Sequence, residues 1–183
     1  MKRHQPKTIA ILGAGGRGAG FGELIKEYGT LGRVAAVAEP RDEYRNGFAA
    51  AHRLPPNRVF RTWQEFAAQP RLCDAVVIAT MDRDHRGPAV ACLNKGYDLL
   101  LEKPMATTLA DCRAIERAQR RSRRIVGVCH SMRYHKGFRM VKELIAAGAI
   151  GRLMTLDQIE QVAYWHQAHS FVRGNWSNAG RAS

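Results

Sequence analysis

A glycine-rich stretch near the start of the chain has the residue types and spacing of a phosphate-binding loop. Gly13, Gly15 and Gly18 fit the spacing G-x-G-x-x-G, and Gly16 and Arg17 fill the two positions before the last glycine. In such a loop the first glycine allows a sharp turn, the second lets the backbone approach a pyrophosphate, and the third lets a helix pack close to a strand. The following helix would offer free N–H groups and a partial positive charge to phosphates. Because glycine-rich turns are common, the motif alone is weak evidence.

A carboxylate and a guanidinium follow the next apolar run. Glu39 lies at about the 20-residue distance at which such folds place an acid that binds the ribose hydroxyls of a dinucleotide. That acid would repel a 2′-phosphate, so the sequence favours NAD slightly over NADP. Arg41 weakens this preference, because its guanidinium could pair with a 2′-phosphate if Glu39 turned away. The alternative is a surface acid at the end of a strand.

A third candidate is the tripeptide Glu102-Lys103-Pro104, which ends another apolar run. At the carboxyl end of a strand, Lys103 could hydrogen-bond a substrate hydroxyl and favour its deprotonation as a hydride leaves. Glu102 would hold the ammonium in place and keep it protonated. The Lys103–Pro104 bond could be cis. The alternative is a solvent-exposed ion pair with no chemical role.

Alternating apolar runs and amphipathic segments predict the elements that position these residues. Strands are expected at 8–12, 33–38, 59–60, 74–80, 97–101 and 125–128. Helices are expected at 16–28, 42–52, 62–68, 84–96 and 108–122. This alternation predicts an α/β Rossmann fold, a doubly wound parallel sheet over residues 1–130.

The pattern changes after residue 130. A helix is expected at 134–147, an exposed-face strand within 151–162, and a loop rich in Trp, His, Asn, Gly and Arg from 164 to 183. One helix and one strand cannot bury a core. Residues 131–183 are therefore expected to begin a second, incomplete domain.

Composition limits the class of protein. The formal net charge of the 183 residues is +13, but the arginines are spread along the chain and no nucleic-acid-binding motif is present, so no nucleic-acid partner is expected. The sequence contains no run of about 18 apolar residues, so no membrane span is predicted. The four cysteines form no C-x-x-C pair, and His166 and His169 lack a third ligand, so no metal is expected. A cytoplasmic location is the prediction.

Several of these stretches together resemble the N-terminal part of the glucose–fructose oxidoreductase and inositol dehydrogenase family, Gfo/Idh/MocA. The residues that carry the resemblance are 13–18, 39–41, 78–85, 101–106, 133–134 and 148–151, and the Glu-Lys-Pro motif is the most specific. The resemblance implies an NAD(P)-dependent oxidoreductase that acts on a sugar, polyol or related hydroxy compound. It makes Lys103 the active-site lysine, with Glu102 beside it.

The resemblance also implies further site residues. Thr80, Asp82 and His85 match a segment that runs under the cofactor, although Met81 stands where many members have proline. His130 and Arg133 match a segment near the nicotinamide, and His130 could equally be a polar residue at a strand end. The loop with His169, Arg173 and Trp176 would border the substrate.

Family members continue for more than a hundred residues with an α+β substrate domain that carries an acid and a histidine. The 183 residues are therefore expected to bind dinucleotide and to turn over poorly or not at all. A homo-oligomer is implied for a protein with the full C-terminal domain. The rival hypothesis is a non-catalytic dinucleotide-binding module or sensor, which would have no need of a placed lysine.

Overall fold

The structure is a computed structural model that describes residues 5–174 and 176–178. The chain divides into two compact units, one that reaches Cys129 and one that begins at His130. The assignment of the second unit to a substrate domain stays a prediction.

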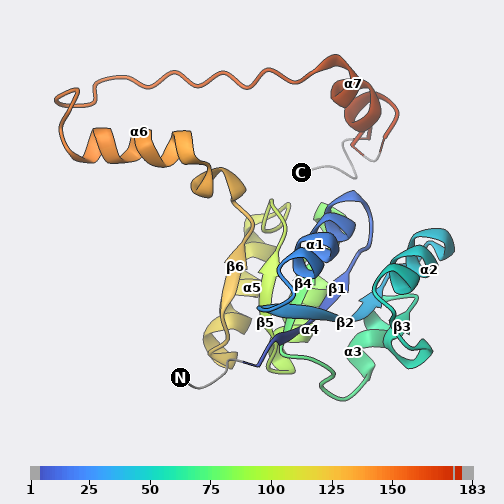
Figure 1. The fold of residues 1–183 in the computed structure, drawn as a ribbon. Helices are drawn as coiled ribbons and strands as arrows, with labels where there is room; N and C mark the ends of the chain where they lie inside the picture. The colour runs from blue at the N-terminus through green and yellow to red at the C-terminus, as the bar shows by residue number, and fades with distance from the viewer. Residues whose placement is uncertain (1–4, 175, 179–183) are drawn as a thin grey trace. The chain divides into compact units, whose positions relative to one another are not determined.

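The first unit is built on a six-stranded sheet with the order β3-β2-β1-β4-β5-β6 (Figure 1). Its strands are β1 (Lys7–Leu12), β2 (Gly32–Ala38), β3 (Val59–Phe60), β4 (Ala75–Ile78), β5 (Asp98–Leu101) and β6 (Val126–Val128). Every neighbouring pair is parallel. The strand order reverses between β1 and β4, the point at which such sheets bind ligands beyond their carboxyl ends. The predicted Rossmann fold is confirmed.

Helices connect the strands close to the predicted positions. They are α1 (Gly16–Glu27), α2 (Asp42–Ala51), η1 (Pro56–Arg58), α3 (Trp63–Ala68), η2 (Asp82–Asp84), α4 (Arg86–Asn94) and α5 (Leu109–Ser122). The hydroxyl of Thr62 caps α3 by accepting a hydrogen bond from the N–H of Glu65, and Thr108 caps α5 in the same way with Asp111, both at 3.1 Å.

The strands send alternate residues to opposite faces of the sheet. Ile11 and Val77 belong to one apolar cluster, which Ala19, Ile25 and Phe48 of α1 and α2 cover. A second cluster receives the intervening strand residues and covers them with side chains of α3, α4 and α5; among its members are Ala10, Leu12, Val76, Ile78, Phe66, Leu93 and Ile115. The period of two along each strand therefore gives both faces a core.

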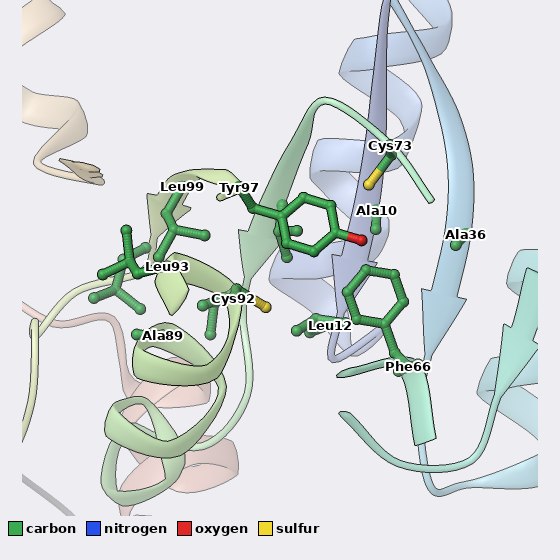
Figure 2. Packing of buried hydrophobic residues seen from close by; sticks show 14 of the residues in the cluster. Ala10, Leu12, Ala36, Phe66, Cys73, Ala89, Cys92, Leu93, Tyr97 and Leu99 are labelled. Atoms are coloured by element: carbon green, nitrogen blue, oxygen red, sulfur yellow. The ribbon is translucent and has the colours of Figure 1, made fainter. Parts of the chain in front are cut away.

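Tyr97 lies at the centre of the second cluster, with its ring directed towards Phe66 and Cys73 (Figure 2). It is fully buried, and its hydroxyl accepts a hydrogen bond of 2.8 Å from the N–H of Leu72. Burial raises the pKa of the Cys73 thiol to about 11 and that of Cys92 to about 12. Both thiols therefore act as packed apolar groups.

The second unit contains η3 (Ser131–Tyr134), α6 (Lys136–Ala146), α7 (Tyr164–His166) and η4 (Gln167–Val172). The strand expected within 151–162 is wrong: this segment pairs with no other strand in the described residues, and an unpaired segment has no ladder of hydrogen bonds. The prediction of a loop from residue 164 is also wrong in part, because Ala163 and Ala168 accept helix-like backbone bonds from Gln167 and Arg173. None of the helices in the described residues is long and apolar enough to cross a membrane.

Candidate functional site

The glycine loop joins the carboxyl end of β1 to the start of α1. Gly13 has a φ of +88°, and a Cβ added there would lie 2.4 Å from the carbonyl oxygen of Ala79. A Cβ added at Gly18 would lie 1.8 Å from the carbonyl oxygen of Gly13. These two glycines are therefore required by the turn and by the contact of helix and strand.

The other two glycines of the loop are not required by backbone contacts. A Cβ at Gly16 would meet nothing within 4 Å, and one at Gly15 would meet only the Nη2 of Arg41, at 3.2 Å. Gly15 is the N-cap of α1, without a side-chain cap and with no acidic residue in the first turn. An uncapped helix N-terminus with an open approach fits a pyrophosphate group.

Glu39 is buried at the end of β2, and both of its oxygens are used by the protein. Oε1 accepts from the N–H and Nε of Arg41, and Oε2 accepts from the N–H of Ala14 at 2.8 Å and from Nη2 of Arg41. Burial disfavours the charged carboxylate, but the hydrogen bonds from Arg41 and Ala14 outweigh it and lower its pKa. Glu39 therefore fixes the glycine loop directly. Its contact with a ribose stays a prediction.

Arg41 presents its guanidinium at the same edge. The group is ion-paired with Glu39 at 2.7 Å, lies 3.9 Å from the centre of the Tyr44 ring, and has a half-exposed side chain. Its position beside Gly15 is fixed by these contacts.

Arg45 was missed by the sequence analysis. Its buried guanidinium donates to the carbonyl oxygens of Glu39 at 2.8 Å and Pro40 at 3.2 Å, and it pairs with Asp42. Arg45 therefore holds the turn that carries Glu39 and Arg41. The i,i+3 spacing of Asp42 and Arg45 was the available signal.

The Glu102-Lys103-Pro104 loop follows β5. Glu102 is 5% exposed; its Oε1 pairs with Arg17 and its Oε2 accepts from the backbone N–H of Lys103 at 2.9 Å. The prediction that Glu102 holds the Lys103 ammonium is therefore wrong, because the guanidinium of Arg17 pairs with this carboxylate instead. The exposed Lys103 ammonium has no hydrogen-bond or ion-pair partner in the described part of the chain.

His85 braces this loop from the other side. It is fully buried, with Nδ1 2.8 Å from the carbonyl oxygen of Pro104 and Nε2 3.3 Å from that of Thr80. The Lys103–Pro104 peptide is cis. Because both ring nitrogens face protein carbonyls and the ring has no exposed surface, the expected contact of His85 with a cofactor is not available in this structure.

Thr80 and Asp82 lie in the same connection between β4 and α4. The Thr80 hydroxyl is buried and has no hydrogen-bond partner among the described residues. Asp82 is buried on η2. An unpaired buried hydroxyl is costly without a partner, so Thr80 fits a polar ligand group at this edge.

The remaining predicted site residues belong to the second unit. His130 and the η3 residue Arg133 are exposed, as are His169 and Arg173, while Trp176 is half-buried. His169 lies in η4, and Arg173 and Trp176 follow it. Asn175 lies outside the described residues. In the residues that the structure describes, no group of three His, Cys, Asp or Glu could hold a metal ion.

A shallow hollow of about 570 Å³ lies elsewhere, between α2 and the η1–β3 connection. Arg45, Leu54 and Arg61 are among its lining residues. None of the predicted site residues lines it, so it is separate from the glycine loop.

Residues 7–130 match the family model GFO_IDH_MocA, an oxidoreductase family with an NAD-binding Rossmann fold. The chain belongs to the Gfo/Idh/MocA family. The resemblance read from the Glu-Lys-Pro motif and the glycine loop is therefore confirmed.

Relatives within the Gfo/Idh/MocA family are longer than this chain. Inositol 2-dehydrogenase 2 of Saccharopolyspora erythraea is 33% identical over 157 residues, which make up 85% of this chain and 45% of that protein. A solved NAD-binding protein from Listeria innocua is 27% identical with a TM-score of 0.69, covering 81% of this chain and 42% of its own. The myo-inositol 2-dehydrogenase of Lactobacillus plantarum, 16% identical with a TM-score of 0.75 over 82% of this chain and 44% of its own, shares the fold. The chain spans less than half the length of these relatives.

Proposed function

We propose that the first unit binds NAD or NADP, with the pyrophosphate at the glycine loop. The observation that carries this proposal is the uncapped N-terminus of α1 beside the open faces of Gly15 and Gly16. Arg17 and Arg41 would add positive charge, and the Thr80 hydroxyl would donate to the cofactor. Such a cofactor supplies the hydride acceptor or donor. The Listeria innocua relative, named as an NAD-binding protein, supports this assignment.

For the whole protein we propose an oxidoreductase that moves hydride to or from a sugar, polyol or related hydroxy compound. Inositol 2-dehydrogenases among the relatives support a polyhydroxylated substrate. Lys103 would hydrogen-bond the reacting oxygen and stabilise the negative charge that develops on it. His130 would lie near the nicotinamide, and Arg133, His169, Arg173 and Trp176 would contact the substrate, as the family resemblance implies.

A non-catalytic dinucleotide-binding module or sensor is the second candidate. The exposed, unpartnered Lys103 on a loop braced by the buried Glu102 and His85 argues against it, because a module that only binds needs no such loop. The two candidate functions are distinguished by whether bound dinucleotide shields Lys103 from acylation.

Two further proposals concern the setting of the protein. We propose a cytoplasmic location, supported by four cysteines that are all unpaired. The family resemblance supports a homo-oligomer for the whole protein, and no nucleic-acid partner is proposed.

Titration with NADH and with NADPH, followed by cofactor fluorescence, tests the binding proposal. We expect a saturable change with at least one of them, and slower acylation of Lys103 in the complex than in the free chain. No fluorescence change with either dinucleotide would refute the proposal. Binding that leaves Lys103 as reactive as before would favour the sensor.

A further inference from the structure

The carboxylate of Glu102 is almost completely removed from water. Its Oε1 lies 2.7 Å from Nε and 2.6 Å from Nη2 of Arg17, and its Oε2 accepts from the N–H of Lys103 at 2.9 Å. A buried carboxylate is costly unless a cation and hydrogen bonds compensate it. Arg17 is the cation that does so here.

Arg17 reaches Glu102 from the first turn of α1. Its guanidinium also lies 5.1 Å from the centre of the Phe21 ring and 3.7 Å from the Sγ of Cys129. Burial, together with the nearby charge of Glu102, raises the pKa of the Cys129 thiol. The thiol therefore stays neutral, and Glu102 is the only anion that Arg17 contacts in the described residues.

Lys103 is the sequence neighbour of Glu102, yet its ammonium has no partner in the described residues. Without Arg17, the buried carboxylate would lack a cation, and Lys103 is covalently next to it. An opposite charge nearby favours the charged form of a lysine. The guanidinium thus competes with the ammonium for one carboxylate.

We propose that Arg17 is a positioning residue that neutralises Glu102 and so leaves the Lys103 ammonium free for a substrate oxygen. This inference rests on the proposed function in one respect, the binding of a substrate oxygen by Lys103. The contacts of Glu102 with Arg17 and with the N–H of Lys103 are present without any ligand. Arg17 then has a role distinct from contact with a pyrophosphate.

The test is the rate at which a water-soluble acetylating reagent modifies Lys103 in the absence of dinucleotide, relative to exposed Lys142 in the same chain. Only the neutral amine is acylated. We expect R17Q to slow the modification of Lys103 by about three-fold or more, because Glu102 then pairs with the ammonium. R17K should react like the wild type, and R17Q/E102Q should recover the wild-type rate.

The sign of the effect separates this role from a structural one. If Arg17 only held the loop, R17Q would loosen it and speed the modification, and an unchanged or faster rate would overturn the proposal. R33Q is the matched control, since it removes one positive charge from an exposed arginine at the other end of the sheet. It should leave the modification rate of Lys103 unchanged. Slowing as large as that in R17Q would also count against the proposal.

A second variant keeps the test decisive if R17Q does not fold. R17Q/E102Q removes both charges of the pair, and Lys103 should react at the wild-type rate because it was not paired with the carboxylate. An increase of about three-fold would show that Glu102 held the ammonium all along and would overturn the proposal. NADH titration of the wild type is a separate measurement, so failure of the cofactor proposal is distinguishable from failure of this one.

Discussion

The carboxylate of Glu39 at the end of β2 accepts a hydrogen bond of 2.8 Å from the backbone N–H of Ala14 in the glycine loop. The same carboxylate pairs with Arg41. One buried acid therefore sets the shape of the loop and the position of the guanidinium next to it.

E39A removes the buried acceptor and leaves the Ala14 N–H without its partner. We expect a loss of about 1–3 kcal/mol in the free energy of unfolding, measured by urea denaturation. E39Q should cost less, because its amide oxygen can still accept from the Ala14 N–H and only the pairing with the half-exposed Arg41 is lost. A smaller loss for E39A than for E39Q would contradict this ranking.

Gly18 and Gly20 form a matched pair within α1. A Cβ at Gly18 would lie 1.8 Å from a backbone carbonyl oxygen, whereas one at Gly20 would meet nothing within 4 Å. We expect G18A to destabilise the fold by about 3 kcal/mol and G20A to be neutral or stabilising, because alanine is the better helix former. Urea unfolding of both variants checks this, and equal stability would contradict the close contact.

Protonation of His52 should weaken the fold in mild acid. Its side chain is 5% exposed and packs 4.3 Å from Phe48, centre to centre, and burial lowers its pKa below the ordinary 6.5. The folded chain therefore favours the neutral ring. The stability that the neutral His52 ring contributes is fully present above the pKa of His52 in the unfolded chain. This stability is lost as the pH falls from that value through the lower pKa of the folded chain.

The check on His52 is the unfolding free energy between about pH 7 and pH 5 in the wild type and in H52F. The slope should be smaller in H52F, since the phenyl ring does not titrate. An identical slope in both proteins would place the pH dependence elsewhere.

Arg41 offers a test of cofactor preference. Its guanidinium lies at the end of β2 beside Gly15, where it could pair with a 2′-phosphate. We expect R41Q to weaken NADPH binding by about ten-fold and NADH binding by much less. Only NADPH carries the 2′-phosphate to which the guanidinium would donate charge-assisted hydrogen bonds. Equal losses for the two dinucleotides would remove Arg41 from this role.

The sequence predicted the parts of the site that depend on local pattern. Apolar runs such as those in 8–12 and 74–80 predicted the strands β1 and β4, and the spacing of the glycines predicted the loop that Gly13 and Gly18 form. The caps of α3 and α5 are equally local, because Thr62 and Thr108 accept from N–H groups only three residues away.

Partners that lie far apart in sequence could not be read in the same way. Glu102 and Lys103 are adjacent, so an ion pair between them was expected, whereas the fold brings Arg17 across 85 positions to the same carboxylate. His85 was assigned to the cofactor, but packing places both of its nitrogens against protein carbonyls. The strand expected within 151–162 needed a partner strand, which local sequence does not specify.

The proposed site places a dinucleotide pyrophosphate over Gly15. In G15A the added Cβ would meet only the Nη2 of Arg41, at 3.2 Å, and the φ of −69° at this position suits alanine. In a fluorescence titration with the dinucleotide that the wild type binds more tightly, we predict binding weakened by about ten-fold or more in G15A, with unchanged unfolding, and wild-type binding in G20A. Wild-type affinity in G15A would show that the pyrophosphate does not bind over Gly15.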